Sequence, residues 1–331
     1  MSLEIPWVEK YRPNKFDDIV SQNIAINRIK EFIKSPNMPH MIFSGPAGTG
    51  KTSTALIIAR NFLKREELDT NLLELNASDT VRIDFVRDVL KNFVSQSLTR
   101  GEGGSLKFVI LDEADNIPGQ VQQALRRIIE KASMNIKFIL LCNYINRIID
   151  PIISRCAVFR FTNLPKEKIV ERLKFITKKE KISIPNDRSE KFFEVLFFIS
   201  GGDLRKAINT LQMSVALELL ENLDLNEILA ISGFLDEHTM ENLIQVLRNK
   251  DFTKARKIIN SLETLDSRNF IRQLLKALSR IKIPTNRIPA LKAVIGEIDY
   301  RICQGANEQI QILALLAEII ENVNSKQVSN N

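Results

Sequence analysis

The sequence predicts an α/β domain built on a parallel sheet, followed by regions made only of helices. Short apolar runs rich in Ile, Val and Phe occur at residues 41–45, 108–111 and 137–142, and their composition is that of buried strands. The stretches between these runs are long enough for crossover helices, an order of elements typical of a parallel sheet. Beyond about residue 165 only helical patterns follow, up to the C-terminus.

The predicted crossover helices run from Thr52 to Leu63 and from Val121 to Ile129, where apolar residues recur at helical spacing. Pro165 suits the first turn of the next helix, because that position needs no backbone N–H donor. We therefore expect a first domain boundary near residue 162 and a second in the stretch NLDLNEILAISGF. The predicted domains are residues 1–162, 163–228 and 229–331.

The C-terminal hundred residues carry about five amphipathic patterns, among them HTMENLIQVLRN and FIRQLLKALSRI. Length agrees with several domains, since 331 residues exceed the roughly 100–200 residues usual for one. A composition of 44% apolar and 26% charged residues, with only 12 Gly and 11 Pro, is typical of a globular, helix-rich chain and excludes a disordered one.

Charge and cysteine usage narrow the class of protein further. The formal net charge of +7 suits a polyanionic partner, although a solvated Lys-rich surface explains it equally well. Cys142, Cys156 and Cys303 are far apart, without a Cys/His cluster of zinc spacing, so we expect reduced thiols. The N-terminus lacks a signal-peptide pattern and no window approaches about 18 apolar residues. A soluble, intracellular protein is expected.

A phosphate-binding loop is the clearest motif. Residues 45–52, Gly45-Pro46-Ala47-Gly48-Thr49-Gly50-Lys51-Thr52, match G-x-x-x-x-G-K-T between a predicted strand and a predicted helix. The glycines let backbone N–H groups surround phosphate oxygens, and the N-terminus of the following helix adds positive potential. Lys51 is expected to contact the β- and γ-phosphates, and Thr52 to ligate Mg²⁺. The sequence therefore predicts an ATP site.

An acidic strand end supplies the second half of this site. Asp112 closes the run FVILD and is expected to hold Mg²⁺ directly or through water. Glu113 follows it and is the candidate for polarising the attacking water. Asn143, at the end of the third run, is expected to orient that water or contact the γ-phosphate. An isolated Asn at a strand end is more often a turn residue, so its assignment depends on the other motifs.

Eight segments together resemble the small subunits of the replication factor C clamp loader, a family of AAA+ ATPases in archaea and eukaryotes. They fall in one order over residues 6–209, and several are specific to that family. The segments are PWVEKYRP at 6–13, GPAGTGKT at 45–52, ELNASD at 74–79, VILDEAD at 109–115, QQALRR at 122–127, CN at 142–143, SRC at 154–156 and GGDLRKAIN at 201–209.

The resemblance implies a fold and further site residues. The fold would be an AAA+ core, a helical lid domain and a helical collar domain for oligomerisation. Arg155 matches an arginine finger that acts in trans on a neighbour's ATP site, and Arg205 matches a second sensor for the γ-phosphate of its own subunit. The segment that lies against the nucleotide base in the family is matched here by Val8, Arg12 and Pro13.

Departures from the family occur next to the expected DNA-facing helix. The family pattern Asp-Arg-Gly-Ile-Asp is replaced by Thr80-Val81-Arg82-Ile83-Asp84, so the contact made by this loop is in doubt. Arg87 and Lys91 are four residues apart and share one helical face. We expect Arg82, Arg87 and Lys91 to contact the DNA backbone, with a solvated basic surface as the alternative.

The function implied by the resemblance is ATP-driven loading of a sliding clamp onto primer-template DNA within a hetero-oligomeric ring or spiral. ATP and Mg²⁺ are the expected cofactors, and clamp, DNA and other loader subunits the expected partners. The compartment would be the cytoplasm in an archaeon and the nucleus in a eukaryote. Two alternatives stay open: a non-hydrolysing scaffold subunit, and a protein-remodelling or helicase-type AAA+ motor, although no aromatic-rich pore loop supports the latter.

Overall fold

The computed structural model divides into two compact units. One unit comprises Met1–Ser183 with Leu196–Gln212, and the other Ile184–Val195 with Met213–Asn331. The predicted division into three domains stays a prediction. The described residues are 5–35, 38–77, 89–94, 106–132, 135–185, 187–262 and 265–323.

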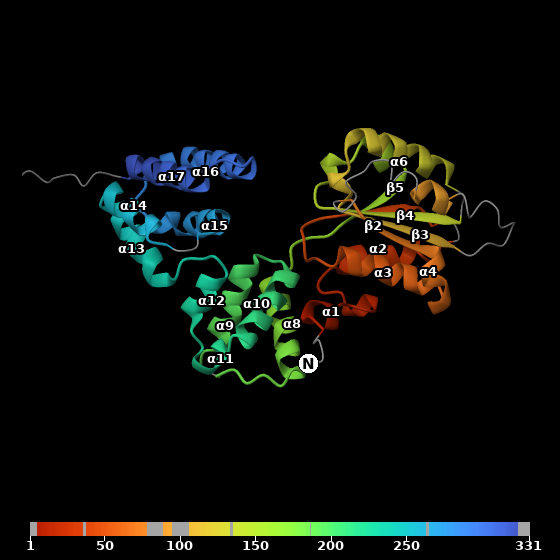
Figure 1. The fold of residues 1–331 in the computed structure, drawn as a ribbon, viewed down its shortest axis with the longest axis horizontal. Helices are drawn as coiled ribbons and strands as arrows, with labels where there is room; N and C mark the ends of the chain where they lie inside the picture. The colour runs from red at the N-terminus through yellow and green to blue at the C-terminus, as the bar shows by residue number, and fades with distance from the viewer. Residues whose placement is uncertain are drawn as a thin grey trace, which may run out of the picture. The chain divides into compact units, whose positions relative to one another are not determined.

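The first unit contains a five-stranded sheet in the order β2-β3-β4-β1-β5, in which every neighbouring pair is parallel (Figure 1). The predicted parallel α/β core is confirmed. The strands are β1 (His40–Ser44), β2 (Leu72–Asn76), β3 (Lys107–Asp112), β4 (Ile136–Cys142) and β5 (Cys156–Arg160).

The two strands at the sheet edges, β2 and β5, were not predicted. Their residues are mostly only partly buried, whereas β4 is buried along its whole length. A strand at an edge has a neighbour on one side alone and carries a weaker apolar signal. The three central strands were therefore the ones that the apolar runs indicated.

Side chains of the central strands alternate between two cores. Met41 and Phe43 of β1 pack with α2 (Asn23–Phe32) and α3 (Lys51–Phe62), while Ile42 packs on the other face with α6 (Gly119–Lys131). Figure 1 shows these helices on opposite faces of the sheet. Because all strands are parallel, their carboxyl ends meet at one edge, where ligands of open α/β sheets bind.

Further helices complete this unit. Helix α8 (Lys166–Lys179) starts directly after Pro165, which is the N-cap residue rather than a residue of the first turn as predicted, and buries Ile169, Leu173 and Ile176. Helix α10 (Leu204–Ala216) follows the GGD segment and α9 (Ser189–Ser200) precedes it, and the division between the two units passes through both helices. The remaining short elements are α1 (Trp7–Lys10), η1 (Phe16–Asp18), η2 (Arg65–Glu67), α4 (Leu68–Asn71), η3 (Ala114–Asn116), η4 (Ile145–Arg147) and α7 (Asp150–Ile153).

The described residues of the second unit form helices and connecting turns without a strand, and its main core forms from Leu235 to Val323. Side chains of Asp236, Asp251, Asp266 and Asn307 accept from backbone N–H groups and fix the starts of four helices. The elements are α11 (Leu219–Asn222), α12 (Leu225–Ile231), α13 (Glu237–Arg248), α14 (Phe252–Asn260), α15 (Ser267–Ala277), η5 (Leu278–Arg280), η6 (Thr285–Arg287), α16 (Ile288–Cys303) and α17 (Glu308–Asn322).

The amphipathic patterns predicted from the sequence correspond to helices α13 to α17. Their apolar faces form the buried cluster, which explains the spacing seen in the sequence. Within the described ranges, none of the helices combines the length and apolar character that crossing a membrane requires.

Candidate nucleotide-binding site

The G-x-x-x-x-G-K-T segment connects β1 to α3 at the carboxyl edge of the sheet. Two of its glycines lie where no other residue fits. A Cβ on Gly45 would lie 2.1 Å from the carbonyl oxygen of Phe161, and one on Gly48, whose φ is +67°, would lie 1.7 Å from Oδ1 of Asp203. The loop is therefore held closely between β5 and the segment that precedes α10.

Lys51 is almost fully buried, with 8% of its surface exposed. Its Nζ donates to the carbonyl oxygens of Gly45 (2.6 Å) and Pro46 (2.8 Å) and to Oδ1 of Asn143 (3.0 Å). Burial lowers the pKa of Lys51, and the carboxylate of Asp112 acts in the opposite direction. The structure thus brings together Lys51 and Asn143, which were predicted from separate motifs.

An oxygen pair suited to a hard cation lies beside this lysine. Thr52 Oγ1 donates to Oδ2 of Asp112 at 2.8 Å, and the other carboxylate oxygen of Asp112 accepts from the N–H of Glu113 at 2.8 Å. A hydroxyl and one carboxylate fit Mg²⁺, which binds through one or two protein oxygens together with phosphates. Among the described residues no cluster of three or more His, Cys, Asp or Glu could hold a metal alone.

Glu113 follows the end of β3 in the left-handed conformation, with φ of +53°. That conformation is unfavourable for a residue with a Cβ and often marks a functional position. Its Oε2 accepts from Nδ2 of Asn116 at 3.1 Å. The turn places Glu113 in the same pocket as Asp112 and Asn143.

Asp115 is a member of this network that the sequence motifs did not single out. Its Oδ2 accepts from the backbone N–H groups of Asn143 (3.2 Å) and Tyr144 (3.1 Å), which joins the end of β4 to the turn after β3. Its buried Oδ1 has no hydrogen-bond partner among the described residues. Asp115 therefore fixes the backbone of Asn143, whose side chain accepts from Lys51. Asp115 belongs to the acidic run DEAD, but only Asp112 and Glu113 of that run were assigned roles from the sequence.

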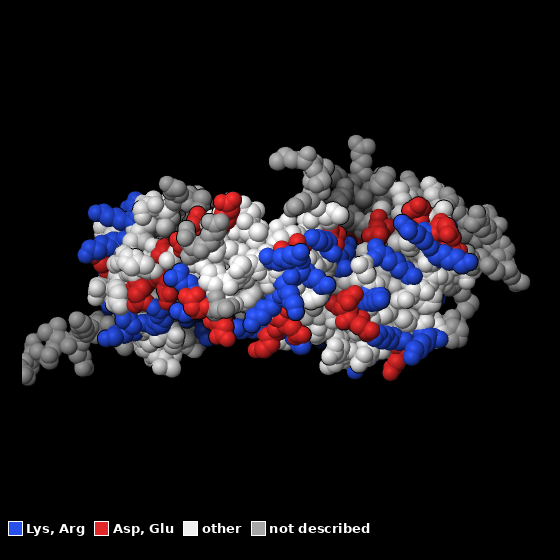
Figure 2. All heavy atoms as spheres, turned by 90° about the horizontal axis from the view of Figure 1, so that it is seen from below, with Lys and Arg blue, Asp and Glu red and all other residues white. Residues whose placement is uncertain are grey.

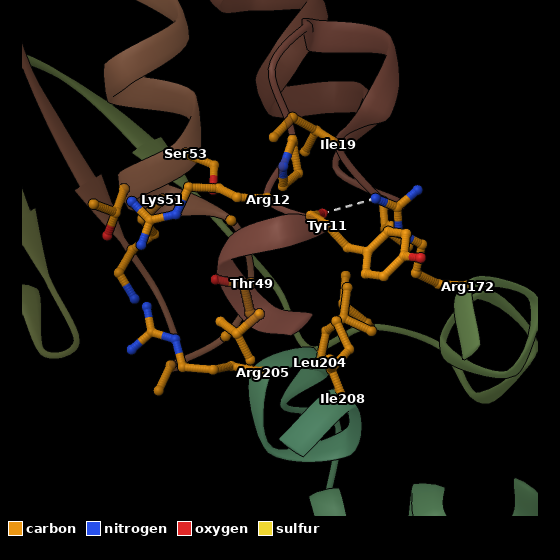
Figure 3. Close-up of a pocket in the computed structure, with 18 of the residues that line it drawn as sticks. Tyr11, Arg12, Ile19, Thr49, Lys51, Ser53, Arg172, Leu204, Arg205 and Ile208 are labelled. Atoms are coloured by element: carbon orange, nitrogen blue, oxygen red, sulfur yellow. Dashed lines mark hydrogen bonds between the residues drawn. The ribbon is translucent and has the colours of Figure 1, made fainter. Parts of the chain in front are cut away.

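Most of the candidate phosphate-binding residues and Arg205 line one pocket. Lys51 and Arg205 point toward one another on one side of this pocket (Figure 3), and the charge of Arg205 also lowers the pKa of Lys51. Two predicted residues, Gly45 and Pro46, do not line the pocket but accept from Lys51. The predicted residues that line it are Val8, Arg12, Pro13, Ala47, Gly48, Thr49, Gly50, Lys51, Thr52, Asp112, Glu113, Asn143 and Arg205.

The opposite side of the pocket is mostly apolar. Tyr11, Ile19 and Ile208 lie there and were not predicted, and neither were Arg172 and Leu204. Val8 and Pro13, which were predicted, and Leu164 also line the pocket. In Figure 3, Tyr11, Arg172 and Ile208 lie away from the ammonium of Lys51. An apolar end next to a cationic end matches the two ends of a nucleotide.

Arg155 is absent from the residues that line this pocket. Its Nη2 lies 2.5 Å from Oε1 of Glu130, and its Nη1 donates to the carbonyl of Pro151 at 2.6 Å. The same Oε1 of Glu130 accepts from Nε of Arg126 at 2.9 Å, and these two arginines hold the pKa of Glu130 below its usual value. The side chain of Arg155 is 36% exposed and so can be reached from outside the chain.

Only one of the three predicted DNA contacts lies in the part of the chain that the structure describes. Arg82 and Arg87 lie outside the described residues, and Lys91 is exposed in the helical residues 89–94. Basic and acidic side chains are interspersed on the face that Figure 2 shows. The DNA assignments stay predictions.

Two segments of the chain match models of known protein families. Residues 41–164 match the family model of the ATPase family associated with various cellular activities, and residues 235–318 match the replication factor C C-terminal domain. Replication factor C small subunit 1 of Pyrobaculum islandicum is 41% identical over 96% of this chain and 94% of its own length. The replication factor C small subunit of Archaeoglobus fulgidus is 42% identical over 94% and 96%.

Solved structures give a more distant similarity. The Thermotoga maritima RuvB Holliday junction branch migration motor aligns with a TM-score of 0.52 and 18% identity, over 72% of this chain and 79% of that one. At this identity the likeness concerns the fold alone, and it agrees with a parallel sheet followed by helices.

Proposed function

Because this chain belongs to the replication factor C small-subunit family, we propose that it is an ATP-hydrolysing clamp-loader subunit that helps to place a sliding clamp on primer-template DNA. Its first unit contains the match to an ATPase family. The observation that carries the proposal is the convergence of Lys51, Thr52, Asp112 and Arg205 on one pocket. A chain that shared only the fold of the family, without its ATPase activity, would not need these four side chains in one pocket.

In the proposed site the N–H groups of residues 45–52 and the ammonium of Lys51 bind the β- and γ-phosphates. Lys51 would exchange its present carbonyl and amide partners for phosphate oxygens. Arg205, on the same side of the pocket, would contact the γ-phosphate of its own subunit. Both cations stabilise the negative charge spread over the transferred phosphoryl group.

Thr52 and Asp112 would hold Mg²⁺, which neutralises phosphate charge when bound. Glu113 is the proposed base for the attacking water, because it follows Asp112 at the carboxyl end of β3 and lines the same pocket. Asn143 would orient that water, with its backbone fixed by Asp115. Release of Glu113 from Asn116 would precede this step.

Arg155 is proposed to act on the ATP site of a neighbouring subunit. Its position outside its own pocket and its partial exposure support a role in trans. An arginine supplied by a neighbour makes hydrolysis depend on assembly. Partner subunits, the clamp and DNA are therefore all expected to influence turnover, with Arg82, Arg87 and Lys91 contacting the DNA backbone.

The test is an ATPase measurement on this chain alone, with partner subunits, and with partners plus clamp and primed DNA. We expect the highest rate in the last mixture. A protein-remodelling or helicase-type motor would not respond to the clamp. A non-hydrolysing scaffold subunit would give the same rate in the assembly whether or not Glu113 is replaced by Gln, and that outcome would contradict the proposal.

A further inference from the structure

The segment from Trp7 to Pro13 is tied to helices that lie far away in the sequence. The N–H of Trp7 donates to Oε1 of Gln212 at 3.0 Å. The hydroxyl of Tyr11 donates to Oε1 of Glu180, and the same oxygen lies 2.6 Å from Nζ of Lys10. These contacts connect the segment with α10 and with the residue that follows α8.

Arg172 of α8 makes the link closest to the pocket. Its Nη2 donates to the backbone carbonyl of Tyr11 at 2.9 Å, a contact drawn in Figure 3. The guanidinium carbon lies 5.0 Å from the ring centroid of Phe175, and the Phe175 ring meets that of Tyr11 edge to face. A planar guanidinium can stack on a ring and donate in its plane at the same time, which a lysine cannot do.

The environment of Arg172 differs from that of its neighbours on α8. Arg172 is half-buried, whereas Lys174 and Lys178 are exposed. Burial lowers the pKa of Arg172, and Asp18 and Tyr11 act in the opposite direction. A desolvated cation that keeps its hydrogen bond fixes its acceptor more firmly than an exposed one does.

Arg172 and Tyr11 both line the apolar end of the pocket, together with Ile19 and Ile208. A purine base presents two apolar faces and a polar edge and suits this end, whereas phosphates suit the end with Lys51 and Arg205. The backbone of Tyr11 to Pro13 forms one wall there, and Arg172 fixes that wall to α8.

We propose that Arg172 is a positioning residue for the base of the bound nucleotide, acting through the Tyr11 carbonyl. This inference rests on the proposed nucleotide site. Without the guanidinium, the carbonyl of Tyr11 loses its donor and the wall is free to move from α8. Ligands that have a base then lose affinity, and ligands made only of phosphate do not.

The test compares ATP with inorganic tripolyphosphate, both with Mg²⁺, by calorimetric titration of the full chain. Arg172→Met keeps the aliphatic stem and removes the donor. We expect its ATP dissociation constant to rise about 5- to 30-fold, with the tripolyphosphate constant unchanged. Arg172→Lys keeps a charged donor and should recover part of the loss. Lys178→Met removes an exposed charge from the same helix and should alter neither constant.

Two results would overturn the proposal. Equal weakening of ATP and tripolyphosphate binding in Arg172→Met would mean that the residue supports the fold in general, and unchanged ATP binding would mean that it has no positioning role. Should Arg172→Met fail to fold, the ratio of the two constants in Arg172→Lys decides in the same way. A wild-type chain that binds neither ligand would instead remove the nucleotide site itself, and the proposed function with it.

Discussion

The two ends of the proposed nucleotide pocket are built in different ways. Apart from Arg205 of α10, the phosphate end consists of turns that follow β1, β3 and β4, so the hydrogen-bonded ladder of the sheet fixes their spacing. The base end combines the segment before Pro13 with residues of α8 and α10, joined by contacts such as that from Arg172 to Tyr11. The phosphate end is thus part of the sheet scaffold, while the base end depends on a few side-chain links.

This difference predicts two kinds of variant. Changes at the phosphate end should affect chemistry or all phosphate ligands, because the scaffold stays in place and only the altered group is missing. Changes at the base end should affect the placement of the nucleoside alone. Four experiments sharpen or break this distinction, and the first concerns turnover.

Glu113→Gln should lower the rate of ATP hydrolysis in the assembly by about 10²–10⁴-fold, because the amide cannot accept the proton of the attacking water. The variant keeps the shape and the hydrogen-bonding oxygen of the side chain, so ATP affinity should stay unchanged. Single-turnover hydrolysis and equilibrium binding measure the two quantities separately. A loss of affinity with normal turnover at saturation would place Glu113 in binding rather than chemistry.

The second experiment uses His40 to measure how the stability of the sheet unit, which carries both ends of the pocket, depends on pH. Its Nδ1 accepts from the N–H of Phe138 at 3.1 Å, and burial lowers its pKa from 6.5 to about 4. Between about pH 4 and pH 6.5, His40 is therefore protonated to a greater extent in the unfolded chain than in the folded chain. The stability contributed by neutral His40 is present above pH 6.5 and is lost as the pH falls toward 4, by up to about 3 kcal/mol.

The measurement is urea unfolding followed by fluorescence of Trp7, the single tryptophan, which lies in the unit of the sheet. His40→Gln keeps an acceptor and cannot titrate, so its unfolding midpoint should change less between pH 7 and pH 5 than that of the wild type. Because no histidine is among the residues that line the pocket, we expect binding of ATP and of tripolyphosphate to decline together with the fold. Identical pH profiles for the two proteins would exclude His40 as the cause.

Lys51→Ala should weaken the binding of ATP and of tripolyphosphate alike, by about 10- to 100-fold, because a charged hydrogen-bond donor to phosphate contributes about 1.5–3 kcal/mol. Lys34→Ala removes an exposed lysine from the same unit and serves as the control. Isothermal titration gives both constants. If only ATP binding changed, the assignment of Lys51 to the phosphate end would be wrong.

Tyr11→Phe gives the smallest expected effect. It removes the hydroxyl that donates to Glu180, while the backbone carbonyl that Arg172 binds is retained. The ATP dissociation constant should rise by less than about 5-fold, in line with the loss of one part-buried hydrogen bond. Tripolyphosphate binding should not change. An effect as large as that of Lys51→Ala would mean that the two ends are not separate.

The two ends also differ in how far the sequence predicted them. Lys51 and Thr52 follow from one continuous motif, because the loop between β1 and α3 forms from adjacent residues. Asp112 and Asn143 follow from strand ends, since parallel strands bring their carboxyl ends together. These positions depend on local structure and on one simple rule of sheet topology.

Arg172 is 161 residues away from the Tyr11 carbonyl that it binds. The charged residues nearest to it in sequence, Glu171 and Lys174, are exposed, so charge and spacing did not distinguish it. Only the packing of α8 on the N-terminal segment gives it a special environment. Arg155 shows the same limit, because its ion pair with Glu130 joins the turn between α7 and β5 to helix α6 and no local pattern predicts it.

At Glu113, whose backbone is left-handed, folding and the proposed catalytic role favour different residues. A residue with a Cβ costs about 1–2 kcal/mol in this conformation, and Asn or Gly adopts it more readily. A search for thermostable variants of this chain would therefore favour those residues at position 113. With Glu113 in its proposed role as the base, such variants would be more heat-resistant and inactive, so turnover would require a glutamate at a position where the backbone conformation disfavours it.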